Sequence, residues 1–285
     1  MALLSMKERE RNRKVLDNIV RYIDKYRIKT GGSDSDDNNS ISDNKLFKLM
    51  AEKVAFQGAR AKLVERLVNK SKHWKRAFAN FDLIKATRLS SRKILKRYWD
   101  KFKVIRFKRK VKQIIKIAQV LLEIKDKYGS FYKYLESFQI PKEIRKEEDI
   151  EKFWQAVDKL RKDLREMGMP SFHRIPSLFH FLMNDMGYPC IKPDVVAMRI
   201  GYLTKIIPKP VGESNQRKLI MAVQYYCFDS KRHTPADVDG YLLCFGGQSA
   251  TQNKMKKGFK ACASDKECTI PECPMIKLKL CRLAK

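Results

Sequence analysis

The stretch that decides the fold is residues 168–202, which read GMPSFHRIPSLFHFLMNDMGYPCIKPDVVAMRIGY. A loop over Met169–Ser177 leads into an apolar segment, Leu178–Met186, that we expect to form a helix. The turn at residues 187–194 then leads into a second helix. Pro193 and Asp194 suit a helix start, and a carboxylate there faces the positive end of the helix dipole. The stretch therefore predicts two helices joined by short loops.

Apolar residues at three- and four-residue spacing continue on both sides of this stretch, and no run of alternating strand residues or fixed-period repeat interrupts them. The fold class is predicted to be mainly α. The domain organisation we expect is an N-terminal helix within 1–29, an acidic flexible linker at 30–44, a helical domain at 45–260 with its hairpin at 169–177, and a Cys-rich loop at 261–285. The N-terminal helix is expected to pack with the C-terminal helices.

Charge is the unusual part of the composition. The 285 residues include 62 Lys and Arg against 32 Asp and Glu, a formal net charge of +30. Such a field attracts polyanions, either nucleic acid or an anionic membrane surface. No apolar run approaches the ~20 residues that a membrane span needs, and the N-terminus lacks a signal-peptide core. We therefore expect a cytoplasmic protein, nucleoid-associated if prokaryotic, whose seven Cys are metal ligands or buried thiols rather than disulfides.

The order of elements around residues 168–202 resembles the helix-hairpin-helix DNA glycosylase superfamily. Gly187, Pro189, Asp194 and Arg199 fall in the register of that superfamily's Gly-x-Pro turn, helix-starting Asp and following basic residue. Upstream, residues 46–59 resemble the helix and Phe-Gln segment of the 3-methyladenine DNA glycosylase I family. Further similar pieces follow in the same order at 74–82, 105–115, 128–138 and 164–168. The resemblance covers residues 45–205 and implies two helical lobes with a DNA groove between them.

This resemblance implies an enzyme that rotates a damaged or modified base out of the duplex and cuts its bond to the sugar. Asp194 is then the catalytic carboxylate, which stabilises the positive charge that develops on the sugar and activates water. Gln57 is the residue that fills the vacated space. The plainer alternatives are a capping Asp and a polar residue at a helix end. Glu52 and Asp185 are weaker candidate acids.

Departures from the family pattern shape the remaining expectations. The hairpin holds no Gly between Gly168 and Gly187, so phosphate contacts are expected to pass to side chains. Pro176 stands where members with lyase activity carry a Lys, which favours a monofunctional glycosylase. Val54 replaces the pocket Glu of the 3-methyladenine enzymes, and Lys62 replaces a Trp. The resemblance therefore implies an alkylated purine as the nearest guess for the substrate, and another damaged or modified base is the alternative. The residues predicted to contact DNA are Gln57, His173, Arg174, Ser177, Lys192 and Arg199.

Most other basic residues are expected to lie on solvated helix faces. The densest basic run is the exception that could touch DNA, and it comprises Lys103, Arg106, Lys108, Arg109, Lys110 and Lys112. Trp74, Trp99 and Trp154 are expected in the core rather than stacked on bases.

Four of the seven Cys crowd into the C-terminal segment, at Cys262, Cys268, Cys273 and Cys281. Endonuclease III-like members of the superfamily close their chains with four Cys around a [4Fe–4S] cluster. The spacing here differs, although Cys273-Pro274 resembles their Cys-Pro. Thiolates in such loops hold Fe–S clusters or Zn. We expect a [4Fe–4S] cluster, with Zn as the alternative.

Two further hypotheses stand beside the glycosylase. One is a non-catalytic DNA-binding protein that keeps the fold. The other is an RNA-binding or membrane-surface protein driven by charge alone. The expected partner of the glycosylase is double-stranded DNA, without a membrane, and the protein is expected to be a monomer.

Overall fold

The computed structural model describes residues 4–28, 41–247 and 255–284. Within these residues it is mainly α-helical, as predicted, with one isolated bridge between Arg27 and Met255 and no β-strand. The predicted linker at 30–44 falls largely outside the described residues, and its last two positions belong to a helix that begins at Asp43. No helix in the described part is long and apolar enough to cross a membrane.

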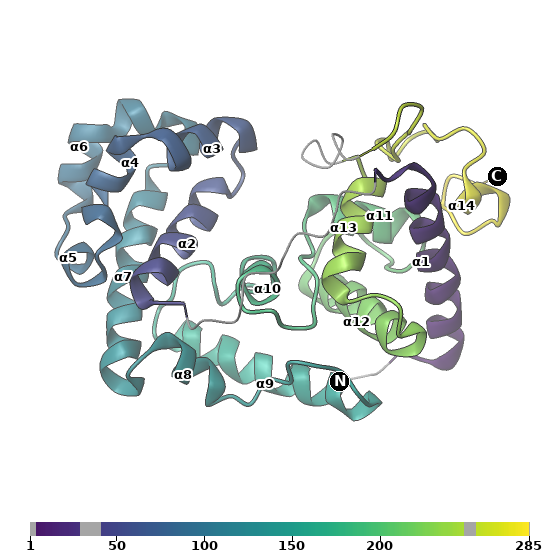
Figure 1. Cartoon of the computed structure of the whole chain (residues 1–285), viewed down its shortest axis with the longest axis horizontal. Coiled ribbons are helices and arrows are strands. Elements are labelled where there is room, and N and C mark those ends of the chain that lie inside the picture. Colours follow the sequence, from purple (N-terminus) through teal and green to yellow (C-terminus); the bar gives the residue numbers. More distant parts are fainter. Residues whose placement is uncertain (1–3, 29–40, 248–254, 285) are drawn as a thin grey trace. The chain divides into compact units, whose positions relative to one another are not determined.

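The chain divides into two compact units (Figure 1). Unit 1 takes the described residues within 1–36, 141–154 and 178–285, and unit 2 takes those within 37–140 and 155–177. The division passes through two helices, α9 (Glu147–Glu166) and α10 (Ile175–Asn184). The single helical domain expected at 45–260 is therefore shared between the two units.

Unit 1 is built on the N-terminal helix α1 (Met6–Tyr26), which packs against the C-terminal helices as predicted (Figure 1). Ser5 and Glu8 form a capping box at its start, and its apolar face, from Val15 to Ile23, is buried. The remaining helices of the unit are α11 (Val195–Leu203), α12 (Glu213–Ser230), α13 (Pro235–Phe245) and α14 (Pro274–Lys277).

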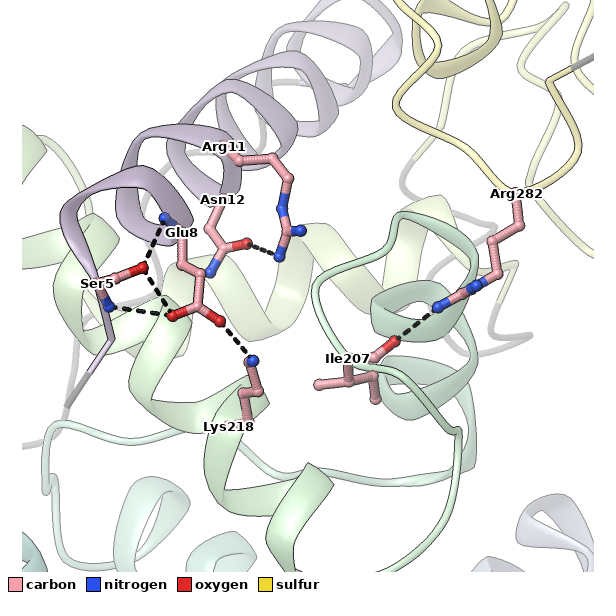
Figure 2. Close-up of polar contacts among 7 residues, drawn as sticks. All are labelled: Ser5, Glu8, Arg11, Asn12, Ile207, Lys218 and Arg282. Atoms are coloured by element: carbon pink, nitrogen blue, oxygen red, sulfur yellow. Dashed lines mark hydrogen bonds and ion pairs between the residues drawn. The ribbon is translucent and has the colours of Figure 1, made fainter. Parts of the chain in front are cut away.

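Polar contacts fix α1 in unit 1. The Glu8 carboxylate accepts a hydrogen bond from Lys218 Nζ of α12 at 2.6 Å, while it also closes the capping box (Figure 2). The lysine and the amide of Ser5 lower the pKa of Glu8 to about 2. The next residue, Arg9, bonds Glu147 at 2.8 Å and Asp229 at 2.7 Å. These contacts join the two ends of the chain within one unit.

Unit 2 is built around α7 (Arg109–Tyr128), whose apolar side chains from Val111 to Ile124 are buried, whereas a polar stripe from Lys112 to Glu123 is exposed. A wide apolar face of this kind is buried against neighbouring helices, and α7 packs against α2 and α5. The other helices of the unit are α2 (Asp43–Phe56), α3 (Ala61–Lys70), α4 (Lys72–Ala77), η1 (Ala79–Phe81), α5 (Leu83–Thr87), α6 (Ser91–Phe102), η2 (Lys103–Ile105) and α8 (Phe131–Glu136).

Trp74 lies at the centre of an aromatic cluster in unit 2. It is fully buried, and its ring contacts Phe78, Phe81 and Phe102 at centroid distances of 4.8, 6.2 and 5.5 Å. Trp154 is likewise buried in unit 1, whereas Trp99 is half-buried. The prediction that the tryptophans belong to the core is thus confirmed for Trp74 and Trp154.

Replacing Trp74 with Ala is expected to destabilise the protein by about 3–5 kcal/mol, because a buried aromatic leaves a cavity that its neighbours fill only in part. Chemical denaturation followed by circular dichroism measures the loss. Trp99→Ala is the control on a half-buried ring. Equal losses from the two variants would contradict the central place of Trp74.

Candidate active site

The predicted hairpin lies in unit 2 as an irregular loop, held by side chains rather than by glycine. The ring Nδ1 of His173 bonds the carbonyl of Met169 at 2.8 Å, and Arg161 Nε donates to the carbonyl of His173 at 3.0 Å. Ser171 has a positive φ of 66°, a conformation for which Gly would be the ordinary choice. Arg174 is exposed at the end of the loop. Of the hairpin residues predicted to contact phosphate, Arg174 is thus the most accessible.

Helix α10 begins at Ile175, three residues before the predicted start at Leu178. The reason is Pro176, whose fixed φ suits the first turn of a helix and whose missing N–H costs nothing there. Ser177 consequently lies in the helix and not in the loop. Its hydroxyl accepts a hydrogen bond from Gln57 Nε2 at 3.1 Å. Ser177 therefore has a protein partner where a phosphate was expected.

Gln57 lies in the turn that ends α2, and both ends of its amide are bonded to the hairpin segment. Besides the bond to Ser177, its Oε1 accepts from the Ser171 hydroxyl at 3.3 Å. The following Gly58 has a φ of 60°. Gln57 is thus held at one surface of unit 2 together with the loop, although the two segments lie more than a hundred residues apart in sequence.

Two cations fix the backbone of this turn. Lys110 Nζ donates to the carbonyls of Ala55, at 2.8 Å, and Gln57, and Arg106 Nη1 donates to the carbonyl of Gly58 at 2.8 Å. Lys110 is 2% exposed, and burial, followed by the charges of Arg106 and Arg109, lowers its pKa to about 8. Cations suit these carbonyls, which stand at the negative end of α2. The sequence carried a signal for the burial of Lys110 that was missed. Lys110 lies four residues, about one turn, before Ile114, so both residues belong to the buried face of α7.

Asp194 lies in unit 1 and begins α11, as predicted. Its Oδ1 accepts hydrogen bonds from the amides of Val196, at 2.9 Å, and Ala197, at 3.1 Å. Among the described residues the other oxygen, Oδ2, meets only Lys192 Nζ, at 3.7 Å. The side chain is 18% exposed. One oxygen therefore caps the helix at its positive end, while the other lies beside Lys192.

Asp239 of α13 supports the segment before Asp194, and sequence analysis did not single it out. Its Oδ1 accepts the backbone N–H of Lys192 at 3.0 Å, and the residue is 4% exposed. Burial, with a smaller contribution from the charge of Asp194, raises the pKa of Asp239 to about 7. Only the packing of α13 on residues 190–194 could have identified it.

Arg199 is directed at protein carbonyls. Its two Nη atoms donate to the carbonyls of Cys262 and Gly246, each at 2.7 Å. These bonds tie α11 to the end of α13 and to the start of the Cys-rich loop. The predicted phosphate contacts of Arg199 and Lys192 stay predictions, beside the contacts that both residues make within unit 1.

The four C-terminal Cys lie in one region of unit 1. Cys262, Cys273 and Cys281 are buried and Cys268 is exposed. Burial above all, and then the charges of the other three Cys, raises the pKa of Cys262 to about 12, against the lowering effect of Arg199. In the part of the chain that the structure describes, however, no group of three or more His, Cys, Asp or Glu is placed to hold a metal ion.

Gly187 and Pro189, from the turn before Asp194, line a cavity of about 410 Å³ in unit 1. Tyr188, Gln224, Cys227 and His233 also line it. Asp194 does not line this cavity. The cavity is therefore not the place where the candidate carboxylate would meet a substrate.

Comparison with known proteins adds a family to this geometry. The family model described as methyladenine glycosylase matches residues 38–188, more than half of the chain. A crystal structure of a mutant 3-methyladenine DNA glycosylase I from Staphylococcus aureus is 23% identical, covers 60% of this chain and 88% of that chain, and has a TM-score of 0.41. No curated protein matches.

The matched residues contain the Gln57 turn, the basic run and the hairpin, and they end six residues before Asp194. Family membership therefore rests on unit 2 and on residues 141–154 and 178–188 of unit 1. The proposed role of Asp194 rests instead on the hydrogen bonds of its carboxylate. The chain belongs to the methyladenine glycosylase family, a family of DNA N-glycosylases that hydrolyse the bond between a base and its sugar.

Proposed function

We propose that this chain removes an alkylated purine from double-stranded DNA, with Asp194 as the carboxylate that stabilises the positive charge developing on the sugar as the base leaves and that activates the attacking water. The observation that carries the proposal is that the two carboxylate oxygens of Asp194 have different surroundings. Two backbone amides hold Oδ1, and Oδ2 has only a lysine at 3.7 Å. A carboxylate fixed in this way is ready to face developing charge without first reorganising.

Lys192 is the residue that would change partner on binding. In the free protein its ammonium lies near Asp194 Oδ2. A DNA phosphate is the stronger competitor for a half-buried lysine, and phosphate contacts set the register of the duplex. Transfer of Lys192 to phosphate would leave the carboxylate facing the sugar. The exposed Arg174 would hold a phosphate from unit 2, beside His173 of the same loop.

Hydrolysis without strand cleavage is consistent with Pro176, which occupies the first turn of α10 and offers no amine for attack on the sugar. The base itself is constrained by Val54, which is fully buried and places no carboxylate near the Gln57 turn. A cationic alkylated base would therefore be recognised through stacking and shape rather than through an ion pair at this position.

The test is base release by the purified chain from duplexes that each carry one modified base, with alkylated purines set beside oxidised and deaminated bases. Release of an alkylated purine, with the sugar–phosphate strand left intact, is the expected result. Tight, salt-sensitive binding without release from any duplex would make the protein a non-catalytic DNA-binding member of the fold. The capping bonds of Asp194, which need no chemistry, are the observation that favours this second function.

We also propose that the C-terminal thiols serve as ligands of a metal centre, a [4Fe–4S] cluster or alternatively Zn. The sulfur of Cys281 accepts a hydrogen bond from the Leu283 amide at 3.4 Å. Amide donors of this kind stabilise thiolates and orient ligands. Bringing the four sulfurs onto one centre requires the loop to close further. A bound centre would fasten the loop to α11 and take no part in hydrolysis.

Metal analysis of the purified protein tests this proposal. Iron with sulfide, or zinc, is expected in stoichiometric amount, and Cys281→Ser is expected to lose it because that buried thiol accepts the Leu283 amide. Cys190→Ser is the matched control, since Cys190 is fully buried elsewhere in unit 1. A metal-free wild-type protein from cells grown with both metals would contradict the proposal.

A further inference from the structure

Phe107 is an exposed aromatic side chain in the most basic part of unit 2. It lies between η2 and α7 and is 39% exposed. The residue before it, Arg106, has a φ of 71°, which is rare for a residue with a Cβ. Backbone strain of this kind persists only where the surroundings hold it, and it concentrates at functional sites.

Cations surround the Phe107 ring. The guanidinium carbons of Arg106 and Arg109 lie 5.5 and 5.0 Å from its centroid, and Lys110 Nζ lies at 5.8 Å. Lys108, on the same loop, lies 5.7 Å from the centroid of Trp99. An aromatic face among cations is the combination that binds single bases of a nucleic acid, where the ring stacks and the cations follow the backbone.

This ring adjoins the Gln57 turn. Phe107 Cε2 lies 4.0 Å from the position that a Cβ on Gly58 would take, and Arg106 bonds the Gly58 carbonyl. The exposed ring and Gln57, the residue predicted to fill the vacated base position, therefore belong to one surface of unit 2.

Helix stability does not explain the cations. Residues 108–112 begin α7, where the helix dipole is positive, yet the first turn holds no acidic residue and no side chain caps it. Positive charges there oppose the dipole. An anion at this helix start would relieve both the dipole and the mutual repulsion of the cations.

We propose that Phe107 stacks on a base beside the flipped nucleotide while Arg106, Lys108 and Arg109 hold the flanking phosphates. This inference rests on the proposed function, since it takes DNA as the partner, and it adds a second contact beside Gln57 to the opening of the duplex. Stacking on an aromatic side chain tolerates any sequence. The contact would therefore strengthen binding at every site without selecting the neighbouring base.

Three variants of Phe107 test the inference by fluorescence anisotropy on a duplex with one modified base. Phe107→Ala and Phe107→Leu are each expected to weaken binding about tenfold, since Leu keeps an apolar side chain but has no π face. Phe107→Trp is expected to keep wild-type affinity, with its emission quenched when DNA binds. Arg109→Ala is expected to lower the slope of log K against log salt by about one. Ile84→Ala removes another exposed apolar side chain of unit 2 and is expected to change nothing.

The outcomes separate this inference from the proposed function. If the wild-type protein releases base and Phe107→Leu binds as tightly as wild type, the stacking role is wrong while the glycosylase stands. If the wild-type protein binds no duplex at all, both are wrong. Thermal unfolding of each variant establishes that a loss of affinity does not come from unfolding.

Discussion

Asp194→Asn is expected to reduce the rate of base release by about 10³-fold while leaving DNA binding within a few-fold of wild type. Asn is as good a helix cap as Asp and has almost the same shape, so the bonds from Val196 and Ala197 to Oδ1 survive. What the variant loses is the negative charge on the second oxygen, and that charge is what a positive transition state needs. Single-turnover release from a duplex with one alkylated purine measures the effect.

The matched control is Asp82→Asn, because Asp82 caps α5 through a bond from the Lys85 amide at 2.9 Å. This variant makes the same chemical change at a helix start of unit 2, and release at the wild-type rate is expected. If Asp194→Asn also released base at the wild-type rate, Asp194 would be only a cap. The carboxylate would then have to be sought elsewhere, first at Glu52 and Asp185.

Local features of the site could be predicted from the sequence because they depend on neighbouring residues. The N-terminal helix predicted within residues 1–29 appears as α1, from Met6 to Tyr26. The dipole argument placed Asp194 at the start of α11, where it caps the helix. The start of α10 was misplaced by three residues, since Pro176 was assigned to the loop although it suits the first turn of a helix equally well.

Contacts between distant segments could not be predicted in the same way. Gln57 bonds Ser171 and Ser177 across 114 and 120 residues, and no local pattern indicates such a pairing. Arg199 is predicted at a phosphate because it is basic and near the hairpin in sequence, and the fold adds two carbonyls within reach of its guanidinium. A basic residue can bond a carbonyl as well as a phosphate, and only the packing of α11 decides between them.

Asp239→Asn is expected to stabilise the protein above about pH 7, where the wild-type carboxylate must ionise inside unit 1. Burial raises the pKa of Asp239 from 3.8 to about 7, so the folded state holds a proton that the unfolded chain releases. Stability therefore falls as pH rises between these two values and is constant above them. Each pH unit in that range costs about 1.4 kcal/mol, so the ionised side chain costs the folded state roughly 4 kcal/mol at most. Asn avoids this cost because it carries no charge, and its oxygen can still accept the Lys192 amide.

Urea unfolding across the range from pH 3.8 to about 7 measures the difference. The wild-type free energy of unfolding is expected to fall more steeply than that of Asp239→Asn, and the two curves are expected to separate as pH rises. Asp100→Asn is the control, since it removes a carboxylate that is 90% exposed and should leave the slope unchanged. Parallel curves for wild type and Asp239→Asn would mean that water reaches this carboxylate. Asp239 would then ionise at little cost to the folded state while its carboxylate still accepted the Lys192 amide.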